Sequence, residues 1–224
     1  MGRDTRAGMT LLELVVALAL VGVMVALAAS TLNSWSADQR AATSARAMSD
    51  AFALARSEAI RTGNNFIVAF KVESGLSGIS SDVVIANDGP TGNTAGVSSN
   101  CVIESGEVVE SISLQQGVRF GSDPSLANGA AAPNDSGASG HQLAGSSFTN
   151  AATGAASWVM FGSDGLPRRF TQNSSTTPPC TALGPVGQAG GAIYVTNGHR
   201  DYAIVMSPLG GVRLHRWTGT GWTQ

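Results

Sequence analysis

The stretch Gly8-Met9-Thr10-Leu11-Leu12-Glu13 and the apolar run Leu14–Ser30 that follows it decide how the chain is organised. Ser30 is the only polar residue of that run. From Met9 to Trp35 there are 27 residues. As an α-helix they extend about 40 Å, which exceeds the roughly 30 Å hydrocarbon core of a bilayer. The segment is therefore long enough to span a membrane as one helix.

Glu13 is the one charged side chain between Met9 and Trp35. A carboxylate at the edge of such a run costs several kcal/mol in lipid unless a partner neutralises it. Cleavage between Gly8 and Met9 would create an α-amino group four residues before Glu13. That amine on one subunit would neutralise Glu13 of a neighbour, and the helix dipole favours negative charge in the first turn.

These residues resemble the leader and first helix of type IV pilins and type II secretion pseudopilins. In that family a prepilin peptidase cuts after the glycine, the new N-terminal residue is N-methylated, and the glutamate guides subunit assembly. The resemblance implies cleavage after Gly8, methylation of Met9 and an assembly role for Glu13. Many major pilins place a helix-bending proline where this chain has Ser30, which implies a straighter anchor, as in many minor pilins.

The orientation follows from the charges before the apolar run. Arg3 and Arg6 favour a cytoplasmic leader, residues 1–8, and a C-terminal body on the far side of the membrane. The sequence leaves an alternative open, because Ala26-Leu27-Ala28 is also compatible with ordinary signal-peptidase cleavage and a soluble, secreted periplasmic binding module. That alternative leaves Glu13 and the Gly8-Met9 junction without a role.

After Trp35 the sequence becomes polar but keeps a helical period, so the helix is expected to continue through residues 36–62 outside the membrane. Gly63 provides a stop. The end of the expected helix, Ala55–Arg61, resembles the helix end of the GspH/FimT group of minor pilins and pseudopilins. In that group a long first helix packs on a β-rich C-terminal domain. The small and apolar positions that carry the period are Ala41, Ala45, Met48, Phe52, Ala55 and Ala59.

From residue 63 the pattern changes to that of short strands separated by Gly, Asn, Pro and Ser. One long helix and these strands predict an α+β fold, pilin-like, with a globular domain at 63–224. Two stretches rich in Gly, Ala, Ser and Asn, 86–100 and 122–156, are predicted to be long mobile loops within that domain. The expected strands are 66–72, 82–85, 108–114, 157–161, 192–195, 202–206 and 212–217.

The rest of the composition constrains the chemistry. The 224 residues carry a net charge of −2 and two cysteines, Cys101 and Cys180. In an oxidising periplasm a disulfide between them is favoured over a metal site, with two buried free thiols as the alternative. The sequence contains no G-x-S-x-G elbow, phosphate-binding glycine loop or H-E-x-x-H helix. We therefore expect no enzymatic activity, no cofactor and no metal.

The body between Gly63 and Gly165 is acidic, whereas the chain from Leu166 onward is basic. Arginine and histidine side chains contact phosphates, and tryptophan rings stack on bases. Some members of the resembling group bind DNA through an Arg-containing C-terminal motif that begins Gly-Arg. Here that place reads Gly210-Gly211-Val212-Arg213. A solvated strand face is the favoured interpretation, with DNA binding as the alternative. The candidate DNA-binding residues are Arg200, Arg213, His215 and Arg216.

The sequence thus favours a minor pilin or pseudopilin, a subunit of a type IV pilus or a type II secretion pseudopilus. The expected partners are other pilin subunits, the prepilin peptidase and the inner-membrane assembly platform. The expected location is the bacterial inner membrane, with one pass and a periplasmic C-terminal domain, followed by incorporation into a filament. A DNA-binding pilin and a soluble periplasmic module are the two alternatives.

Overall fold

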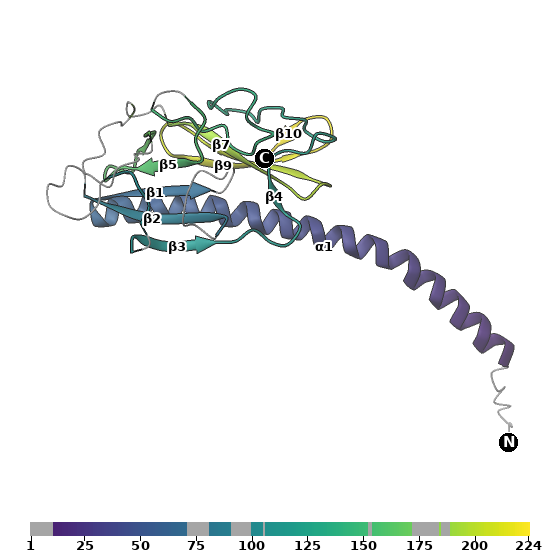
Figure 1. Ribbon diagram of the computed structural model, residues 1–224. Coiled ribbons are helices and arrows are strands. Elements are labelled where there is room, and N and C mark those ends of the chain that lie inside the picture. Colours follow the sequence, from purple (N-terminus) through teal and green to yellow (C-terminus); the bar gives the residue numbers. More distant parts are fainter. Residues whose placement is uncertain are drawn as a thin grey trace, which may run out of the picture. The chain divides into compact units, whose positions relative to one another are not determined.

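The computed structural model describes residues 11–70, 81–90, 100–104, 106–151, 154–171, 184 and 189–224. Their arrangement is α+β, with one long helix followed by two antiparallel sheets (Figure 1). This confirms the fold class predicted from the sequence. The chain divides into two compact units, Met1–Ala37 and Asp38–Gln224. The predicted leader, residues 1–8, and Met9 lie outside the described residues.

Helix α1 comprises Leu11–Thr62. It ends where the sequence predicted, because Gly63 adopts a φ of 73° and its N–H donates to the carbonyl of Ala59 at 3.0 Å. A left-handed residue just after a helix is readily supplied by glycine, which has no Cβ to clash. The predicted apolar stripe is confirmed as the buried side of the second half of the helix. Its six members, Ala41, Ala45, Met48, Phe52, Ala55 and Ala59, are at most 1% exposed.

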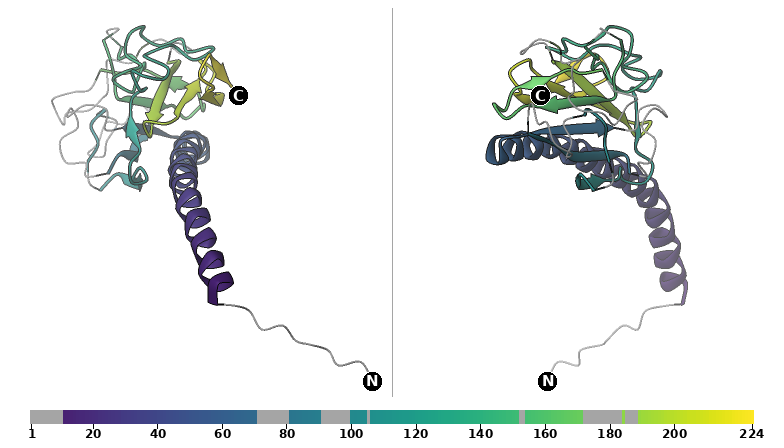
Figure 2. Two further views of the ribbon diagram at one scale, coloured as in Figure 1. Left: turned by 90° about the vertical axis from the view of Figure 1, so that its right-hand side faces the viewer. Right: turned by 60° about the vertical axis from the view of Figure 1, so that its left-hand side comes forward.

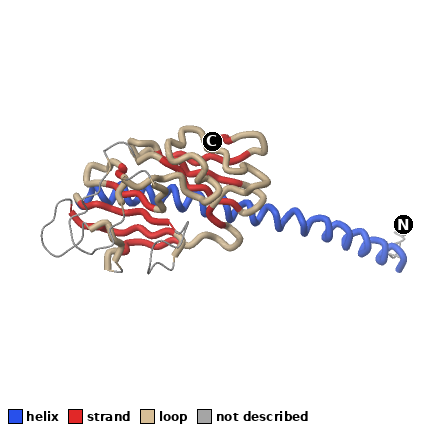
Figure 3. The backbone as a smooth tube through the Cα atoms, turned by 45° about the horizontal axis from the view of Figure 1, so that its top comes forward, coloured by secondary structure: helices blue, strands red, loops and turns tan. Residues whose placement is uncertain are grey.

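The strands of the second unit form two sheets, visible as separate groups beside the helix in Figure 3. Sheet A has the order β3-β2-β1-β5-β6 and sheet B the order β10-β9-β8-β7-β4. All the strand pairs are antiparallel, as expected for strands linked by turns. The bounds in sheet A are β1 Asn64–Phe70, β2 Val83–Pro90, β3 Val108–Ile112, β5 Trp158–Phe161 and β6 Pro167–Arg168. Those in sheet B are β4 Arg119–Phe120, β7 Gly191–Thr196, β8 Asp201–Met206, β9 Val212–Trp217 and β10 Trp222–Thr223.

Each strand expected from the sequence is present, with bounds that differ by a few residues. Strand β2 continues through Pro90, so the predicted loop 86–100 is wrong for its first five residues, and residues 91–99 lie outside the description. Strands β4, β6 and β10 were not predicted. Each has two residues, too few to display a period of two in the sequence.

One apolar core joins the helix to both sheets. Phe52 of α1 lies at its centre, with ring centroids 6.0 Å from Phe148 and 6.4 Å from Phe161. These tilted and edge-on arrangements are the ones aromatic rings prefer. On sheet B the same core receives Ile193 of β7 and Ile204 of β8. The helix therefore provides a common surface on which the two sheets pack.

The predicted loop 122–156 contains no helix or named strand among its described residues, yet hydrogen bonds fix it to sheet B. The hydroxyl of Tyr194 donates to Asp135 Oδ2 at 2.7 Å, and Ser147 Oγ donates to Asp135 Oδ1 at 2.6 Å. The N–H of Ser147 donates to the carbonyl of Ala192 at 3.0 Å. In both views of Figure 2 the loop lies on the side of sheet B away from α1. The glycine-rich composition predicted mobility and did not indicate this attachment.

Candidate functional site

The N-terminal unit presents an apolar helical surface with one acidic residue near its start. Glu13 lies in the first turn of α1, and its side chain is exposed. Leu11 and Leu18 are 82% and 63% exposed. Among the residues with described side chains, which leave out 27–31, no helix is long and apolar enough to cross a membrane. The predicted cleavage residues Gly8 and Met9 lie outside the description.

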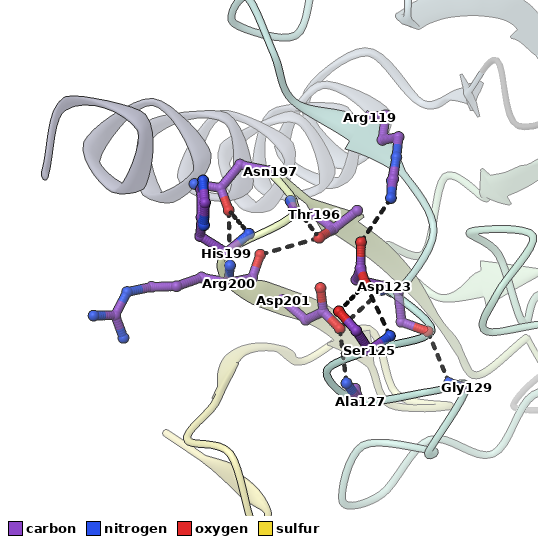
Figure 4. Close-up of polar contacts among 12 residues, drawn as sticks. Arg119, Asp123, Ser125, Ala127, Gly129, Thr196, Asn197, His199, Arg200 and Asp201 are labelled. Atoms are coloured by element: carbon purple, nitrogen blue, oxygen red, sulfur yellow. Dashed lines mark hydrogen bonds and ion pairs between the residues drawn. The ribbon is translucent and has the colours of Figure 1, made fainter. Parts of the chain in front are cut away.

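At the other end of the chain, residues 197–200 form the turn between β7 and β8 (Figure 4). The side chain of Asn197 makes the turn by accepting the N–H groups of His199 and Arg200 at 2.9 and 2.7 Å. Asparagine is suited to this because its amide oxygen reaches the backbone two residues ahead. Asp201 then begins β8 with its carboxylate turned to the loop, where it accepts the N–H groups of Asp123 and Ala127.

Arg200 extends from this turn to the helix. Its Nε lies 2.5 Å from Oδ2 of Asp38, and Nδ2 of Asn197 donates to Oδ1 of the same carboxylate at 3.2 Å. Burial raises the pKa of Asp38, but the hydrogen bonds from Arg200 and Asn197 outweigh it, and the pKa is lowered overall. Asp38 is therefore ionised at neutral pH and neutralises Arg200.

Arg216 of β9 lies on the face of sheet B that packs on α1, the helix that carries Asp38. It is opposite Tyr202 across β8 and β9, and cross-strand partners share a face of the sheet. Tyr202 belongs to the core that contacts α1. Burial raises the pKa of Tyr202, while the positive charges of Arg200, Arg216 and Arg46 oppose that rise. Arg216 and Tyr202 thus share the face of sheet B that packs on α1.

Arg213 and His215 lie on the opposite face of sheet B. Their cross-strand partners, Val205 and Ala203, belong to a separate cluster beneath the loop 122–156. Arg213 is exposed and lines an open pocket of about 550 Å³. His215 is 3% exposed, and neither ring nitrogen has a hydrogen-bond partner among the described residues.

The protonation of His215 follows from this position. Burial and, secondarily, the charge of Arg213 lower the pKa of its imidazole, which favours the neutral ring. A neutral, buried imidazole provides no cation for a phosphate. The four residues considered for DNA binding therefore do not form one surface: Arg200 and Arg216 lie on the helix side, and Arg213 and His215 lie on the other. The interpretation of Arg213 and Arg216 as one strand face is wrong, because an interval of three residues reverses the face of a strand.

A buried acidic group lies near Cys101, far along the sequence from these arginines. Asp88 of β2 is 0% exposed and accepts the N–H groups of Asn100 and Cys101, each at 3.2 Å. Burial and then the negative charge of Glu107 raise the pKa of Asp88 to about 7. Cys101 is buried, and the described chain has no free cysteine. Cys180 lies outside the described residues, so the pairing of Cys101 with Cys180 stays a prediction.

Sequence reasoning did not identify Asp38, Arg46 or Asp88. Asp38 contacts a residue 162 positions away in the sequence, and no local pattern reveals such a contact. The one available signal for Asp88 was a carboxylate three residues after the strand-like run 82–85. Within the described residues, no group of three His, Cys, Asp or Glu side chains is placed to hold a metal ion.

Comparison with known proteins adds evidence at the N-terminus. Residues 3–29 match the family model of the prokaryotic N-terminal methylation motif. No curated protein and no solved structure matches the chain. The matched motif is typical of type IV pilins and other prepilin-like proteins, so this chain carries a prepilin-type N-terminal segment followed by an α+β unit with a pilin-like arrangement.

Proposed function

We propose that this protein is a minor pilin or pseudopilin of the GspH/FimT type, a structural subunit without enzymatic activity. The match of residues 3–29 to the methylation motif is the observation that carries the proposal. The 52-residue helix and the antiparallel β unit after it support the proposal. The subunit passes the inner membrane once through residues 9–35 and exposes its globular unit to the periplasm. Its partners are other pilin subunits, the prepilin peptidase and the inner-membrane assembly platform.

The proposal includes a disulfide between Cys101 and Cys180. A periplasmic location supports it, because thiols of exported proteins are oxidised there. A disulfide that closes the loop between Cys101 and Cys180 stabilises a fold by about 4 to 5 kcal/mol in the chain-entropy model.

Processing provides the direct test. We expect the mature protein to begin with N-methylated Met9, as measured by mass spectrometry of the intact protein and of its N-terminal peptide. Gly8→Ala should slow the appearance of the mature form, because the peptidase accepts a small residue poorly in place of glycine. A bulkier residue at position 8 should leave the precursor uncut.

The same spectrum distinguishes the competing secreted module. Cleavage by signal peptidase after Ala28 would yield an N-terminus at Ala29 without methylation, and finding it would refute the proposal. The choice between a type IV pilus and a type II pseudopilus needs a genetic test. Deletion of the gene, scored for piliation, DNA uptake and protein secretion together, identifies the assembly that requires the subunit.

DNA binding is the second candidate function, and the geometry argues against it. Arginines that contact phosphates release counterions, so a DNA-binding surface loses affinity steeply as salt rises. Arg213 and Arg216 lie on opposite faces of sheet B, and His215 is buried. We expect weak duplex binding in a mobility-shift titration, with little change in Arg213→Ala/Arg216→Ala. Tight, salt-sensitive binding that the double variant abolishes would establish the receptor function instead.

A further inference from the structure

The face of sheet B beneath the loop 122–156 carries a buried histidine, His215 of β9. Its side chain is 3% exposed, and neither ring nitrogen has a hydrogen-bond partner among the described residues. Buried polar groups in proteins generally have at least one such partner. The imidazole of His215 is therefore held in place by the packing of its neighbours.

That packing is provided largely by aromatic rings. The register of sheet B places His215 in one row with Ala203 of β8 and Tyr194 of β7. The indole of Trp222 in β10 has its ring centroid 5.7 Å from that of Tyr194 and 5.3 Å from that of Trp217, and it packs against the cluster that includes Ala203. Trp222 thus lies across this row, where the small Ala203 leaves room for it, and helps to enclose His215.

Two charged groups share the face of His215 on the neighbouring strand positions. Arg213 lies two residues before His215 on β9, and its positive charge disfavours a second one nearby. Asp201 of β8 lies two residues before Ala203 and shares its face. Its Oδ2 accepts two N–H groups of the loop 122–156 at 3.0 and 3.1 Å, and its Oδ1 is buried without a partner among the described residues.

The other elements around this row contribute charges that are already engaged. The hydroxyl of Tyr194 in β7 donates to Asp135 of the loop at 2.7 Å. Asp123 of the same loop pairs with Arg119 at 2.8 Å. Strand β10 contains no charged residue. A proton on His215 therefore adds a buried charge to surroundings that offer a cation and carboxylates bound to other donors.

We propose that Trp222 and strand β10 form a pH-sensitive latch, which opens when His215 is protonated and then loosens the attached part of the loop 122–156. Strand β10 is the element that yields, because it has two residues and pairs with β9 alone. The latch holds the loop through Trp222, whose Nε1 donates to the carbonyl of Ala130 at 3.1 Å. Opening breaks this bond and exposes the imidazolium to water. The inference concerns the globular unit and does not need the membrane anchor.

The direction of the pH effect follows from linkage. Above the ordinary histidine value of about pH 6.5, His215 is neutral in the open and in the closed latch, and pH has no effect through this group. Below it, the open latch takes up a proton that the closed latch excludes, so the ratio of open to closed rises by up to about tenfold per pH unit. Burial and the charge of Arg213 lower the pKa of His215 in the closed latch, which agrees with this direction.

The test is hydrogen–deuterium exchange of the full chain in detergent, at about pH 7.5 and about pH 5.5, with rates corrected for intrinsic exchange. The peptide covering 217–224 reports on the latch, because the N–H of Thr218 donates to the carbonyl of Gly221 at 2.9 Å and β10 pairs with β9. We expect its protection factor to fall by up to about tenfold at the lower pH. The peptide covering 129–133 should lose protection with it, whereas β1 should not change.

Matched variants assign the proton. His215→Gln replaces the imidazole with an uncharged polar group, and its protection should be equal at both pH values. His199→Gln and His141→Gln, in the β7–β8 turn and in the loop, should keep the wild-type response, as should Asp201→Asn. In the wild type, NMR of the three histidine rings gives an independent readout, and the midpoint of His215 should coincide with the loss of protection.

Three results would overturn the latch. Protection of 217–224 that does not change with pH in the wild type, or a fall that persists in His215→Gln, would show that His215 does not control the strand. A fall abolished by Asp201→Asn and kept in His215→Gln would assign the proton to the carboxyl instead. An equal loss of protection in β1 would show that the globular unit opens as a whole.

Discussion

Glu13→Ala is expected to remove the subunit from sheared filaments while leaving its globular unit folded. The expected loss is at least tenfold, because without Glu13 the charged N-terminal amine of a neighbouring subunit is left unpaired beside an apolar run at a cost of several kcal/mol, and about 1.4 kcal/mol already changes an equilibrium tenfold. Glu13 lies in the first turn of α1, and that turn belongs to the N-terminal unit, Met1–Ala37. Its replacement therefore leaves the core around Phe52 untouched.

The measurement is the ratio of filament-bound to membrane-bound protein after shearing, by immunoblot. Glu58→Ala is the matched control, since it makes the same change on the same helix. Glu58 pairs with Arg61 at the surface, and such exposed pairs contribute little. Equal recovery of Glu13→Ala and wild type in filaments would contradict the assembly role. Equal losses in both variants would point to a general effect of removing an acidic residue from the helix.

The elements governed by local periodicity were predictable. The spacing from Ala41 to Ala59 specified which side of α1 is buried, and Gly63 specified its end. Strands such as β8 and β9 could be identified because a run of alternating or β-branched residues is bounded by turn residues. The prepilin-type segment was predictable for another reason: the methylation motif is a continuous stretch, residues 3–29, and is identified without any folded context.

What depends on contacts between distant residues was not predictable. The pairing of Asp38 with Arg200 joins the helix to a turn, and the anchoring of loop 122–156 depends on Asp135 reaching Tyr194. The separation of Arg213 from Arg216 was available in principle from the two-residue period of a strand. A list of basic residues does not show this separation, because composition records the charges of a segment but not the faces of the strand on which they lie.

The burial of the Asp88 carboxyl was likewise not predictable from the sequence, and it leads to a measurable prediction. Its pKa is about 7 in the folded protein, raised by burial and by Glu107, against about 3.9 in an unfolded chain. Below about pH 4 the group is protonated in both states. Between about pH 4 and pH 7 the unfolded chain releases the proton while the folded protein keeps it, so rising pH favours unfolding. This one group should reduce the free energy of unfolding by on the order of 4 kcal/mol at most across that range.

Asp88→Asn should abolish this decline. The amide matches the shape of the protonated acid, and its oxygen still accepts the N–H groups of Asn100 and Cys101. Urea titrations of the full chain in detergent, followed by tryptophan fluorescence from pH 4 to pH 8, give the difference in unfolding free energy between variant and wild type. That difference should increase with pH in favour of the variant and level off above about pH 7. Asp50→Asn, an exposed change on α1, should keep the wild-type slope.

The carboxyls of Asp38 and Asp123 do not confuse this measurement, because their pKa values shift the opposite way. Hydrogen bonds from Arg200 and from Ser125 help hold the pKa values of Asp38 and Asp123 below normal. Their stabilising effect is complete above the unfolded value of about 3.9 and is lost only as pH falls further. A decline between about pH 4 and pH 7 that persists unchanged in Asp88→Asn would therefore show that another group takes up the proton. Its absence from the variant alone would assign that proton to the carboxyl that binds the backbone of Cys101.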